Sequence, residues 1–344
     1  MDQHDVMFRN EGAIGRITLN RPKVLNALTE DMCAAMYARL RDWAADSAIH
    51  TVVIDASPGK AFCAGGDVRA VYEAGKKRDG SVMSFFRTEY PMNAAIHRFR
   101  KPYVALVDGF AFGGGCGVSM HGSHRVASEN AVFAMPETAI GLFPDIGATF
   151  FLNRLPGQLG MYLALTGARI GAADAIYCGL ATHFVTSRDH AGLLSRLTAG
   201  EAPDAVLAQM STEPAGVSEL ATHREAIDRA FAGSSIEHVL MRLGNEGEWG
   251  GETVSLLKTR SPTSLKVTFR QMREGATLDF ESCQRMEYRM MARMMEGPDF
   301  YEGVRAALIE KDQSPRWIPA DLDKVSEADI DRFFAPLDAG EFTM

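Results

Sequence analysis

The sequence predicts an α/β core followed by a mainly helical C-terminal region. Short apolar runs that end in polar loops indicate strands buried on both faces, and stretches with helical periodicity separate them. Strands that alternate with helices favour repeated right-handed strand–helix turns around a parallel sheet. Strand-like runs become rare after residue 187, where several helical stretches follow. We therefore expect the α/β core over residues 1–187 and the helical region over residues 188–344.

Turn chemistry and helical spacing predict the first elements. Asn10-Glu11-Gly12 separates two segments, residues 6–9 and 13–20, which predicts a β-hairpin. Thr29 can cap a helix, because its hydroxyl can accept a hydrogen bond from the first turn. The apolar residues that follow lie on one face of that helix: Met32, Met36, Leu40 and Trp43.

Two buried strands are predicted by short apolar runs, residues 51–55 and residues 103–108. The intervening chain contains a loop over residues 57–67 and a mostly helical stretch to about residue 100. The remaining elements follow in chain order: short strands at 125–127 and 132–134, helices from about 147 to 178, and clear helical spacing over 262–273 and 280–295.

Composition and charge exclude several classes of protein. The net charge of −8 and the isoelectric point near 5.6 leave no basic stripe for nucleic-acid phosphates. The five cysteines are odd in number and form no Cys-x-x-Cys pair, which argues against disulfides and a thiolate zinc site. The first residues lack the pattern of a signal peptide, and no run of about 18 apolar residues could span a membrane. We expect a soluble, cytoplasmic protein with no nucleic-acid or membrane partner.

Glycine is more abundant than usual, with 32 of 344 residues, or ~9% against a usual ~7%. Small residues, glycines among them, concentrate in two segments, residues 61–68 and 109–120, and each segment follows a predicted strand. Each segment can pass from loop into helix and leave backbone N–H groups without intrahelical partners. Such groups favour negative charge, including the charge that develops on a carbonyl oxygen.

Three familiar glycine motifs do not fit these segments. Gly109 and Gly114 have the spacing of a phosphate-binding P-loop, but no Lys-Ser/Thr pair follows. A dinucleotide fingerprint would require glycine at Val118, and a nucleophile elbow would require glycine at His121. Two interpretations stay open at this point. The loops form a backbone oxyanion hole, or their glycines only permit tight turns and close packing.

The chain resembles the crotonase (enoyl-CoA hydratase/isomerase) superfamily in several motifs that occur in the family's order. These motifs are Leu19-Asn-Arg-Pro-Lys-Val-Leu-Asn-Ala-Leu28, Phe62-Cys-Ala-Gly-Gly-Asp67, Lys101-Pro102, Gly109 with Gly113-Gly-Gly115, and Pro136-Glu137 with Gly141. The resemblance implies a spiral core of repeated ββα units and an acyl-CoA ligand. By position, it implies that the N–H groups of Gly66 and Gly114 form an oxyanion hole, and that Ala64 and Asp67 bind the substrate.

The sequence departs from the hydratase pattern at one informative position. Hydratases of the superfamily carry a glutamate where this chain has Gly117, whereas their second glutamate corresponds to Glu137. Asp145 stands where the hydratases have a glycine. Together with Glu89 in Phe86-Arg-Thr-Glu-Tyr90, this combination resembles the thioester-hydrolase branch that acts on 3-hydroxyisobutyryl-CoA in valine breakdown. Lys311-Asp-Gln-Ser-Pro-Arg-Trp317 is a further match.

The resemblance implies that Glu137 and Asp145 are catalytic and that Glu89 binds the substrate hydroxyl. A carboxylate near an oxyanion hole can attack a thioester to give a mixed anhydride, or it can deprotonate water. Without the resemblance, Glu137 fits a residue in the first turn of a helix and Asp145 fits a turn or helix-cap residue. Glu89 then fits a solvated residue on a helix. For Cys63 and Cys116, packing is favoured over a nucleophilic role.

Three functions stay open. The sequence favours an acyl-CoA thioester hydrolase, and the alternatives are a hydratase, isomerase or lyase of the same superfamily and a non-catalytic acyl-CoA-binding protein. Gly117 disfavours ordinary hydration, and the intact Glu137 and Asp145 disfavour a non-catalytic protein. No metal or redox cofactor is implied, and CoA counts as part of the substrate. The resemblance also implies a homo-oligomer, either a trimer or a hexamer.

Overall fold

The structure, a computed structural model, describes residues 4–78, 80–338 and 340–342. The chain forms two compact units. The first comprises Met1–Asp67, Thr88–Ala134 and Arg169–Thr222, and the second comprises Val68–Arg87, Met135–Ala168 and His223–Met344. The predicted boundary at residue 187 lies inside a segment of the first unit. It marks the point after which no described residue belongs to a strand, and it is not the edge of a compact unit.

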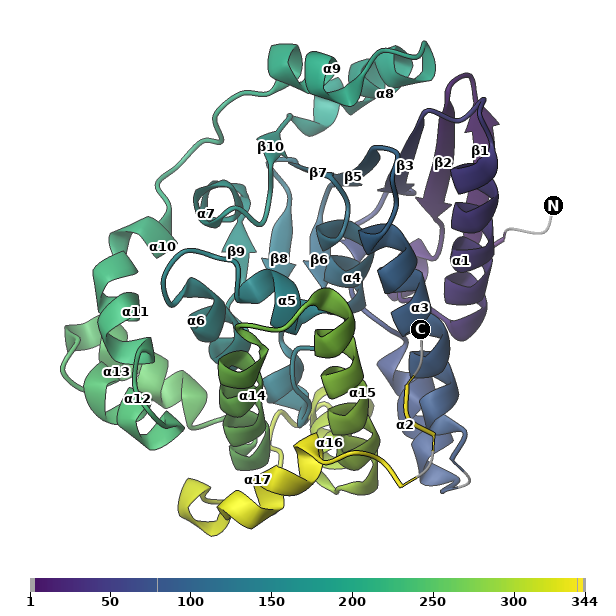
Figure 1. Ribbon diagram of the computed structural model, residues 1–344. Helices are drawn as coiled ribbons and strands as arrows, with labels where there is room; N and C mark the ends of the chain where they lie inside the picture. The colour runs from purple at the N-terminus through teal and green to yellow at the C-terminus, as the bar shows by residue number, and fades with distance from the viewer. Residues whose placement is uncertain (1–3, 79, 339, 343–344) are drawn as a thin grey trace. The chain divides into compact units, whose positions relative to one another are not determined.

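A six-stranded sheet in the first unit confirms the predicted α/β core (Figure 1). Its strands, in spatial order, are β1 (Val6–Glu11), β2 (Ile14–Leu19), β3 (Thr51–Ala56), β5 (Tyr103–Val107), β7 (His124–Ala127) and β10 (His183–Phe184). β1 and β2 pair antiparallel across the predicted turn, and all later neighbours pair parallel. The parallel strands are apolar runs because both of their faces are buried.

Helices of the first unit bury their apolar faces against this sheet. α1 (Glu30–Ala45) is the predicted helix, and the Thr29 hydroxyl accepts a hydrogen bond from Met32 N at 3.3 Å. The Trp43 ring packs on β2, where a Cβ added to Gly15 would come within 2.5 Å of the ring. α8 (His190–Thr198) and α9 (Pro203–Met210) share one buried cluster with the strands: Ile14, Val53, Val104, Leu106, Val126, Val185, Leu193, Leu197, Val206 and Leu207.

A second sheet of the first unit is only partly predicted by the sequence patterns. It contains β4 (Ala61–Cys63), β6 (Phe110–Phe112), β8 (Val132–Ala134) and β9 (Ile170–Gly171), in that order. Only β8 is predicted. β4 and β6 lie inside the two glycine-rich segments, and β9 has only two residues, so none of these three stands out as a separate strand-like run. Each glycine loop thus follows a strand of this sheet, β4 or β6.

The first unit contains five further short elements. η1 (Pro22–Val24), α4 (Gly114–Met120) and α7 (Ala172–Cys178) lie between strands, and η3 (Ser187–Asp189) and α10 (Glu219–Thr222) follow β10. α3 (Val82–His97) begins in the second unit and ends in the first, and Pro91 lies inside it.

The second unit is built from helices, which confirms the helical character predicted for the C-terminal region. Its elements are α2 (Val68–Lys76), η2 (Glu137–Ile140), α5 (Ala148–Leu152), α6 (Leu159–Thr166), α11 (Arg224–Phe231), α12 (Ile236–Leu243), α13 (Gly247–Leu257), α14 (Pro262–Gly275), α15 (Phe280–Glu296), α16 (Asp299–Val304), η4 (Arg305–Ile309), η5 (Leu322–Lys324) and α17 (Glu327–Phe334).

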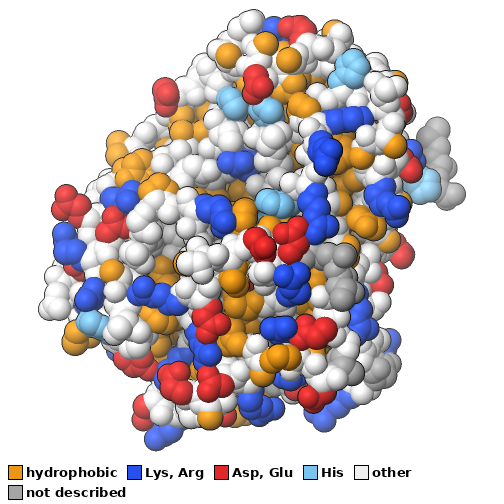
Figure 2. All heavy atoms as spheres, in the orientation of Figure 1, with side chains coloured by type: hydrophobic (Ala, Val, Ile, Leu, Met, Phe, Trp, Pro, Cys, Tyr) orange, Lys and Arg blue, Asp and Glu red, His pale blue; other side chains and the backbone are white. Residues whose placement is uncertain are grey.

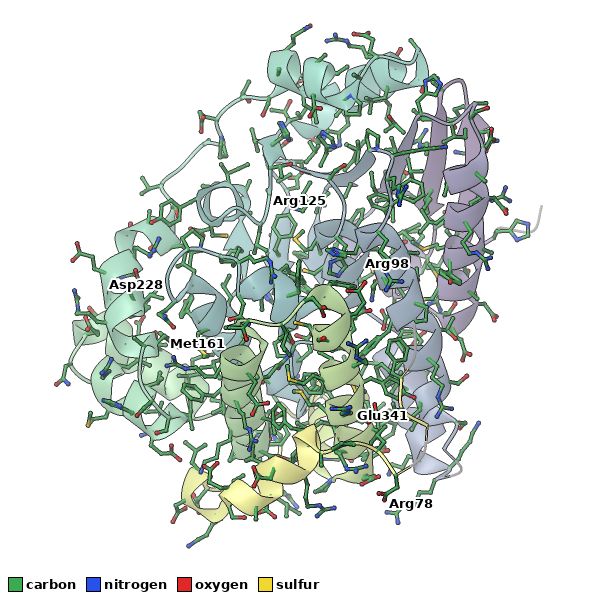
Figure 3. All side chains as sticks on the ribbon, viewed as in Figure 1. Arg78, Arg98, Arg125, Met161, Asp228 and Glu341 are labelled. Carbon is green, nitrogen blue, oxygen red and sulfur yellow. The ribbon has the colours of Figure 1, made fainter. Side chains whose placement is uncertain are left out.

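Two of these helices, α14 and α15, pack on the segment between β8 and β9. α14 contacts α5 and α6, and α15 contacts α5 and α17 (Figure 1). Polar contacts add to this packing, since Asp228 on α11 accepts a hydrogen bond from Gln158 N at 2.7 Å, just before α6 (Figure 3). The helical region therefore buttresses α5 and α6 rather than forming a separate module.

Charged side chains of both signs lie on the surface, and the cysteines lie in the interior. Basic and acidic side chains are intermingled over the face drawn in Figure 2. All five cysteines are buried, and none of them forms a disulfide. Among the described helices, none is both long enough and apolar enough to cross a bilayer.

Candidate active site

Two glycine loops follow neighbouring parallel strands of the four-stranded sheet. β4 leads into the Gly65–Gly66 loop, and β6 leads into the Gly113–Gly114 loop. Gly65 and Gly113 have φ angles of +111° and +47°, in the region that favours glycine. Because adjacent parallel strands end at the same edge of a sheet, the two loops meet there.

The loops approach so closely that Gly114 has no room for a side chain. A Cβ on Gly114 would lie 3.1 Å from Gly66 N and 2.8 Å from Glu89 Oε1. Neither the Gly66 N–H nor the Gly114 N–H donates to a backbone acceptor among the described residues. Glu89 lies on α3 and is 2% exposed. The structure thus brings three predicted site residues together, two as backbone donors and one as a buried carboxyl group.

Ala64 and Asp67, which the resemblance places in substrate binding, flank the same loop. Ala64 N donates to Leu25 O at 2.9 Å, and Asp67 N donates to Leu28 O at 2.8 Å. The Asp67 carboxylate forms an ion pair with Arg21, with 3.3 Å between Oδ2 and Nη1. These contacts brace the loop, and a part for either residue in substrate binding stays a prediction.

The two thiols near the loops are interior groups. Cys63 is fully buried and Cys116 nearly so. Burial raises the pKa of the Cys63 thiol to about 12, so this thiol is protonated at neutral pH. Cys116 Sγ donates a hydrogen bond to Ala111 O at 3.2 Å. Both observations favour the packing role over a nucleophilic one.

Glu137 opens η2 in the second unit and points into the interior of the protein. Its side chain is buried, at 7% exposure, and its Oε2 atom has no hydrogen-bond partner among the described residues. Burial raises the pKa of this carboxyl group well above its usual range, and the charge of Asp145 raises the pKa further. A carboxyl group of this kind is more basic, when ionised, than an ordinary glutamate.

Close backbone contacts hold the turn that carries Glu137. Gly141 ends η2 with a φ angle of +73°, and a Cβ there would come within 2.3 Å of the Asp299 backbone. Leu142 N donates to Glu137 O at 2.9 Å. These contacts leave the backbone of Glu137 little freedom, which suits a catalytic group.

Asp145 lies in the turn between η2 and α5 and is 7% exposed. The two residues that follow, Ile146 and Gly147, have φ angles of +56° and +81°. A branched side chain seldom adopts this left-handed conformation. The negative charge of Asp145 acts on the pKa of Glu137. The structure therefore brings the two predicted catalytic carboxyl groups within electrostatic reach of each other.

Comparison with protein families decides the assignment. The model of the enoyl-CoA hydratase/isomerase family matches residues 14–334, which is most of the chain. The chain belongs to this family. The resemblance predicted from the sequence motifs is thereby confirmed.

Curated relatives of this enoyl-CoA hydratase/isomerase family member extend over nearly the whole chain. The mitochondrial 3-hydroxyisobutyryl-CoA hydrolase of Xenopus tropicalis is 46% identical over 343 residues, which cover 97% of this chain and 89% of that protein. The human protein of the same name is 44% identical and covers 98% of this chain, over 90% of its own length.

Solved structures of the family confirm the predicted fold. A carnitinyl-CoA dehydratase from Mycobacterium thermoresistibile superposes with a TM-score of 0.93 at 39% identity and covers 98% of both chains. An enoyl-CoA hydratase from Rhodobacter sphaeroides 2.4.1 superposes with a TM-score of 0.89 at 39% identity, over 97% of this chain and 98% of that one.

Sequence patterns miss two buried polar residues of this family member, Gln271 on α14 and Glu287 on α15. Both are fully buried and bind the turn that carries Asp145. Gln271 donates a hydrogen bond to this turn, and Glu287 accepts one from it. A signal for Glu287 exists in the sequence. It lies three and seven residues before Met290 and Met294, on a helix face that is otherwise apolar.

The described residues supply two kinds of chemistry. The first unit offers paired backbone N–H groups that can polarise a carbonyl oxygen. The second unit offers buried carboxyl groups that can act as nucleophile or general base. Within the described part of the chain, no group of three or more His, Cys, Asp or Glu side chains could hold a metal ion.

Proposed function

We propose that this chain hydrolyses 3-hydroxyisobutyryl-CoA to 3-hydroxyisobutyrate and free CoA, a step of valine breakdown. The observation that carries the proposal is the Glu137 carboxyl group, which is buried beside Asp145 with one oxygen unpartnered among the described residues. The names of the curated relatives support the substrate. Gly117, on α4, stands where hydratases of the superfamily carry their first glutamate, so hydration would lack one of its two carboxylates.

In the proposed reaction, the N–H groups of Gly66 and Gly114 donate to the thioester carbonyl oxygen. Negative charge builds on this oxygen as the carbonyl carbon becomes tetrahedral, and the two donors stabilise that charge. Both N–H groups are free of backbone acceptors among the described residues, which supports this role. Removing one such donor typically lowers turnover ~10²–10³-fold.

Glu137 acts in its ionised form by one of two routes. In the first route it attacks the carbonyl carbon, and the tetrahedral adduct expels the thiolate to leave a mixed anhydride. Water then hydrolyses this anhydride, which releases the free acid and restores the Glu137 carboxylate. In the second route it takes a proton from a water molecule that attacks the same carbon. In both routes the electron pair of the C–S bond leaves with the CoA thiolate, a good leaving group because a thiol has a pKa of about 8.5.

The remaining predicted residues have supporting roles in the proposal. Asp145 keeps the pKa of Glu137 raised and orients the water or the leaving group. Glu89 binds the 3-hydroxyl group of the substrate near Gly114. Ala64 and Asp67 contribute to substrate binding from the loop that carries Gly66.

The proposal extends to cofactor, assembly and location. The reaction needs no metal or redox cofactor, which activity after treatment with EDTA and desalting would test. A homo-oligomer, trimer or hexamer, would appear in sedimentation velocity. Five cysteines without a disulfide support a reducing compartment, proposed to be the cytoplasm, whereas the curated relatives are named mitochondrial. Cell fractionation distinguishes the two locations.

A second candidate function follows from the solved structures. The two solved structures described above are named as a dehydratase and a hydratase, and each is 39% identical to this chain. Hydration or dehydration of an acyl-CoA is therefore the alternative within the same family.

One pair of assays separates the candidates. The purified protein is given 3-hydroxyisobutyryl-CoA with a thiol reagent, and crotonyl-CoA with detection of the loss of the double bond. Thiol release without hydration is the expected result. Rapid hydration without thiol release would establish the alternative, and neither reaction would indicate a non-catalytic acyl-CoA-binding protein.

A further inference from the structure

A buried carboxyl group on α15 holds the turn that carries Asp145. Glu287 is fully buried, and its Oε2 accepts a hydrogen bond from Gly147 N at 2.7 Å. Its Oε1 accepts two more, from Thr149 N at 3.0 Å and from the Thr149 hydroxyl at 2.6 Å. Three donors from one short turn therefore converge on this single side chain.

A second buried side chain reaches the same turn from α14. Gln271 Nε2 donates to Pro144 O at 2.6 Å and to Thr149 Oγ1 at 2.7 Å. Pro144 immediately precedes Asp145, and Gly147 and Thr149 follow it. The two helices thus fix the backbone on both sides of Asp145.

The conformation of the turn explains why it needs such support. Ile146 and Gly147 are consecutive residues with φ angles of +56° and +81°. A β-branched residue is disfavoured in this region and persists there only where its surroundings over-determine the backbone. The hydrogen bonds that Glu287 accepts and those that Gln271 donates constrain the backbone of this turn. Conformational strain of this kind concentrates at functional sites.

We propose that Glu287 is a positioning residue of the hydrolase, which fixes the Asp145 carboxyl group beside Glu137 through its hydrogen bonds to Gly147 and Thr149. The inference rests on the proposed function of Glu137 and Asp145. A simpler alternative is that Glu287 only caps α5, because the Gly147 and Thr149 groups that donate to it lie at the start of that helix. In that case its loss would lower stability and leave turnover of the folded enzyme unchanged.

The substitution Glu287→Gln separates the two roles. A carboxyl group can accept from the two backbone N–H groups on different oxygens, whereas an amide would turn its NH₂ toward one of these donors. We expect kcat to fall roughly 10–100-fold, because a catalytic group displaced by about 1 Å loses turnover on this scale. We expect KM to stay within about threefold of the wild-type value, since Glu287 does not touch the substrate in the proposal.

Two further variants calibrate this result. Glu287→Asp keeps an acceptor on both oxygens and should recover part of kcat, and it replaces Glu287→Gln if the latter folds poorly. Glu296→Gln makes the same chemical change at an exposed position of α15 and should leave kcat unchanged. A folded Glu287→Gln enzyme with wild-type kcat overturns the inference.

A double-mutant cycle tests whether Glu287 acts through Asp145. In an Asp145→Asn background, the effect of Glu287→Gln on kcat should shrink to about twofold or less, because residues that act as one unit are not additive. Equal losses in both backgrounds would show that Glu287 acts independently of Asp145 and would overturn the inference.

Hydrogen exchange provides a readout that needs no substrate. At least one of the Gly147 and Thr149 amides should exchange faster in Glu287→Gln than in the wild type or in Glu296→Gln, because the NH₂ group of glutamine cannot accept its hydrogen bond. Unchanged exchange at both amides contradicts the inference whatever the activity. If the wild type releases no thiol from 3-hydroxyisobutyryl-CoA, the proposed function fails, while the exchange data still decide whether Glu287 holds the turn.

Discussion

Gly114 lies so close to Glu89 that a Cβ on the glycine would come within 2.8 Å of Glu89 Oε1. The same Cβ would lie 3.1 Å from Gly66 N, one of the two proposed oxyanion donors. Both distances are shorter than ordinary van der Waals contacts of carbon. A single methyl group at position 114 therefore crowds a backbone donor and a buried carboxyl group at once.

The substitution Gly114→Ala should lower kcat for thioester hydrolysis roughly 10²–10³-fold, the usual cost of losing one oxyanion donor. The physical reason is that the alanine methyl group occupies the space beside Gly66 N and displaces Glu89. Thiol release under saturating substrate measures the effect. Gly171→Ala is the matched control, because a Cβ at Gly171 meets nothing within 4 Å. Equal activity of the two variants would contradict the assignment of Gly114.

The substitution Glu137→Gln should abolish thiol release, with kcat lowered at least ~10³-fold, since an amide can neither attack the thioester nor accept a proton from water. Binding of acyl-CoA should persist, and calorimetric titration with the substrate measures it. Glu248→Gln, at an exposed position of α13, serves as the control. Substantial turnover by the Glu137 variant would exclude this residue as nucleophile or base.

The main features of the fold could be predicted from periodicity and turn chemistry. The β1–β2 hairpin, α1, β3, β5, α14 and α15 all appear where the patterns predict them. The patterns fail for β4 and β6, which lie inside the glycine-rich segments, and for β9, which has two residues. The neighbouring strands of the sheet specify these strands more than their own sequence does. The compact units likewise do not follow the chain, since each is assembled from three separate segments.

The candidate site was predictable where sequence motifs report local backbone requirements or match the family pattern, as at Glu137 and Asp145. Glycine is needed at Gly114 because backbone and side-chain atoms approach it from two other segments, and such a need leaves a motif. Glu287 leaves none, because its partners Gly147 and Thr149 lie far earlier in the chain. Its only trace is a carboxyl group on a buried helix face, which the methionines around it obscure.

The pH dependence of activity should report the interaction between Glu137 and Asp145. The raised pKa of Glu137 means that kcat/KM rises with pH until this carboxyl group is ionised. The negative charge of Asp145 contributes to that pKa, so Asp145→Asn should lower it and move the acid limb to lower pH. The measurement is the midpoint of log kcat/KM against pH, with the exposed Asp323→Asn as control. An acid limb that stays in place or moves to higher pH would contradict the coupling.

The stability of the fold should depend on pH through Glu287. Burial raises the pKa of this group from 4.5 to about 8, because the hydrogen bonds it accepts offset only part of the desolvation. The folded state therefore holds this proton more strongly than the unfolded state does. The contribution is fully present below about pH 4.5 and is lost as the pH rises through about 8. Glu287→Gln does not titrate, so the stability of the wild type relative to this variant should fall between pH 5 and pH 8, by at most about 1.4 kcal/mol per pH unit. Urea unfolding of both proteins at several pH values measures this difference, and a difference that grows with pH would show that the folded protein favours the ionised form.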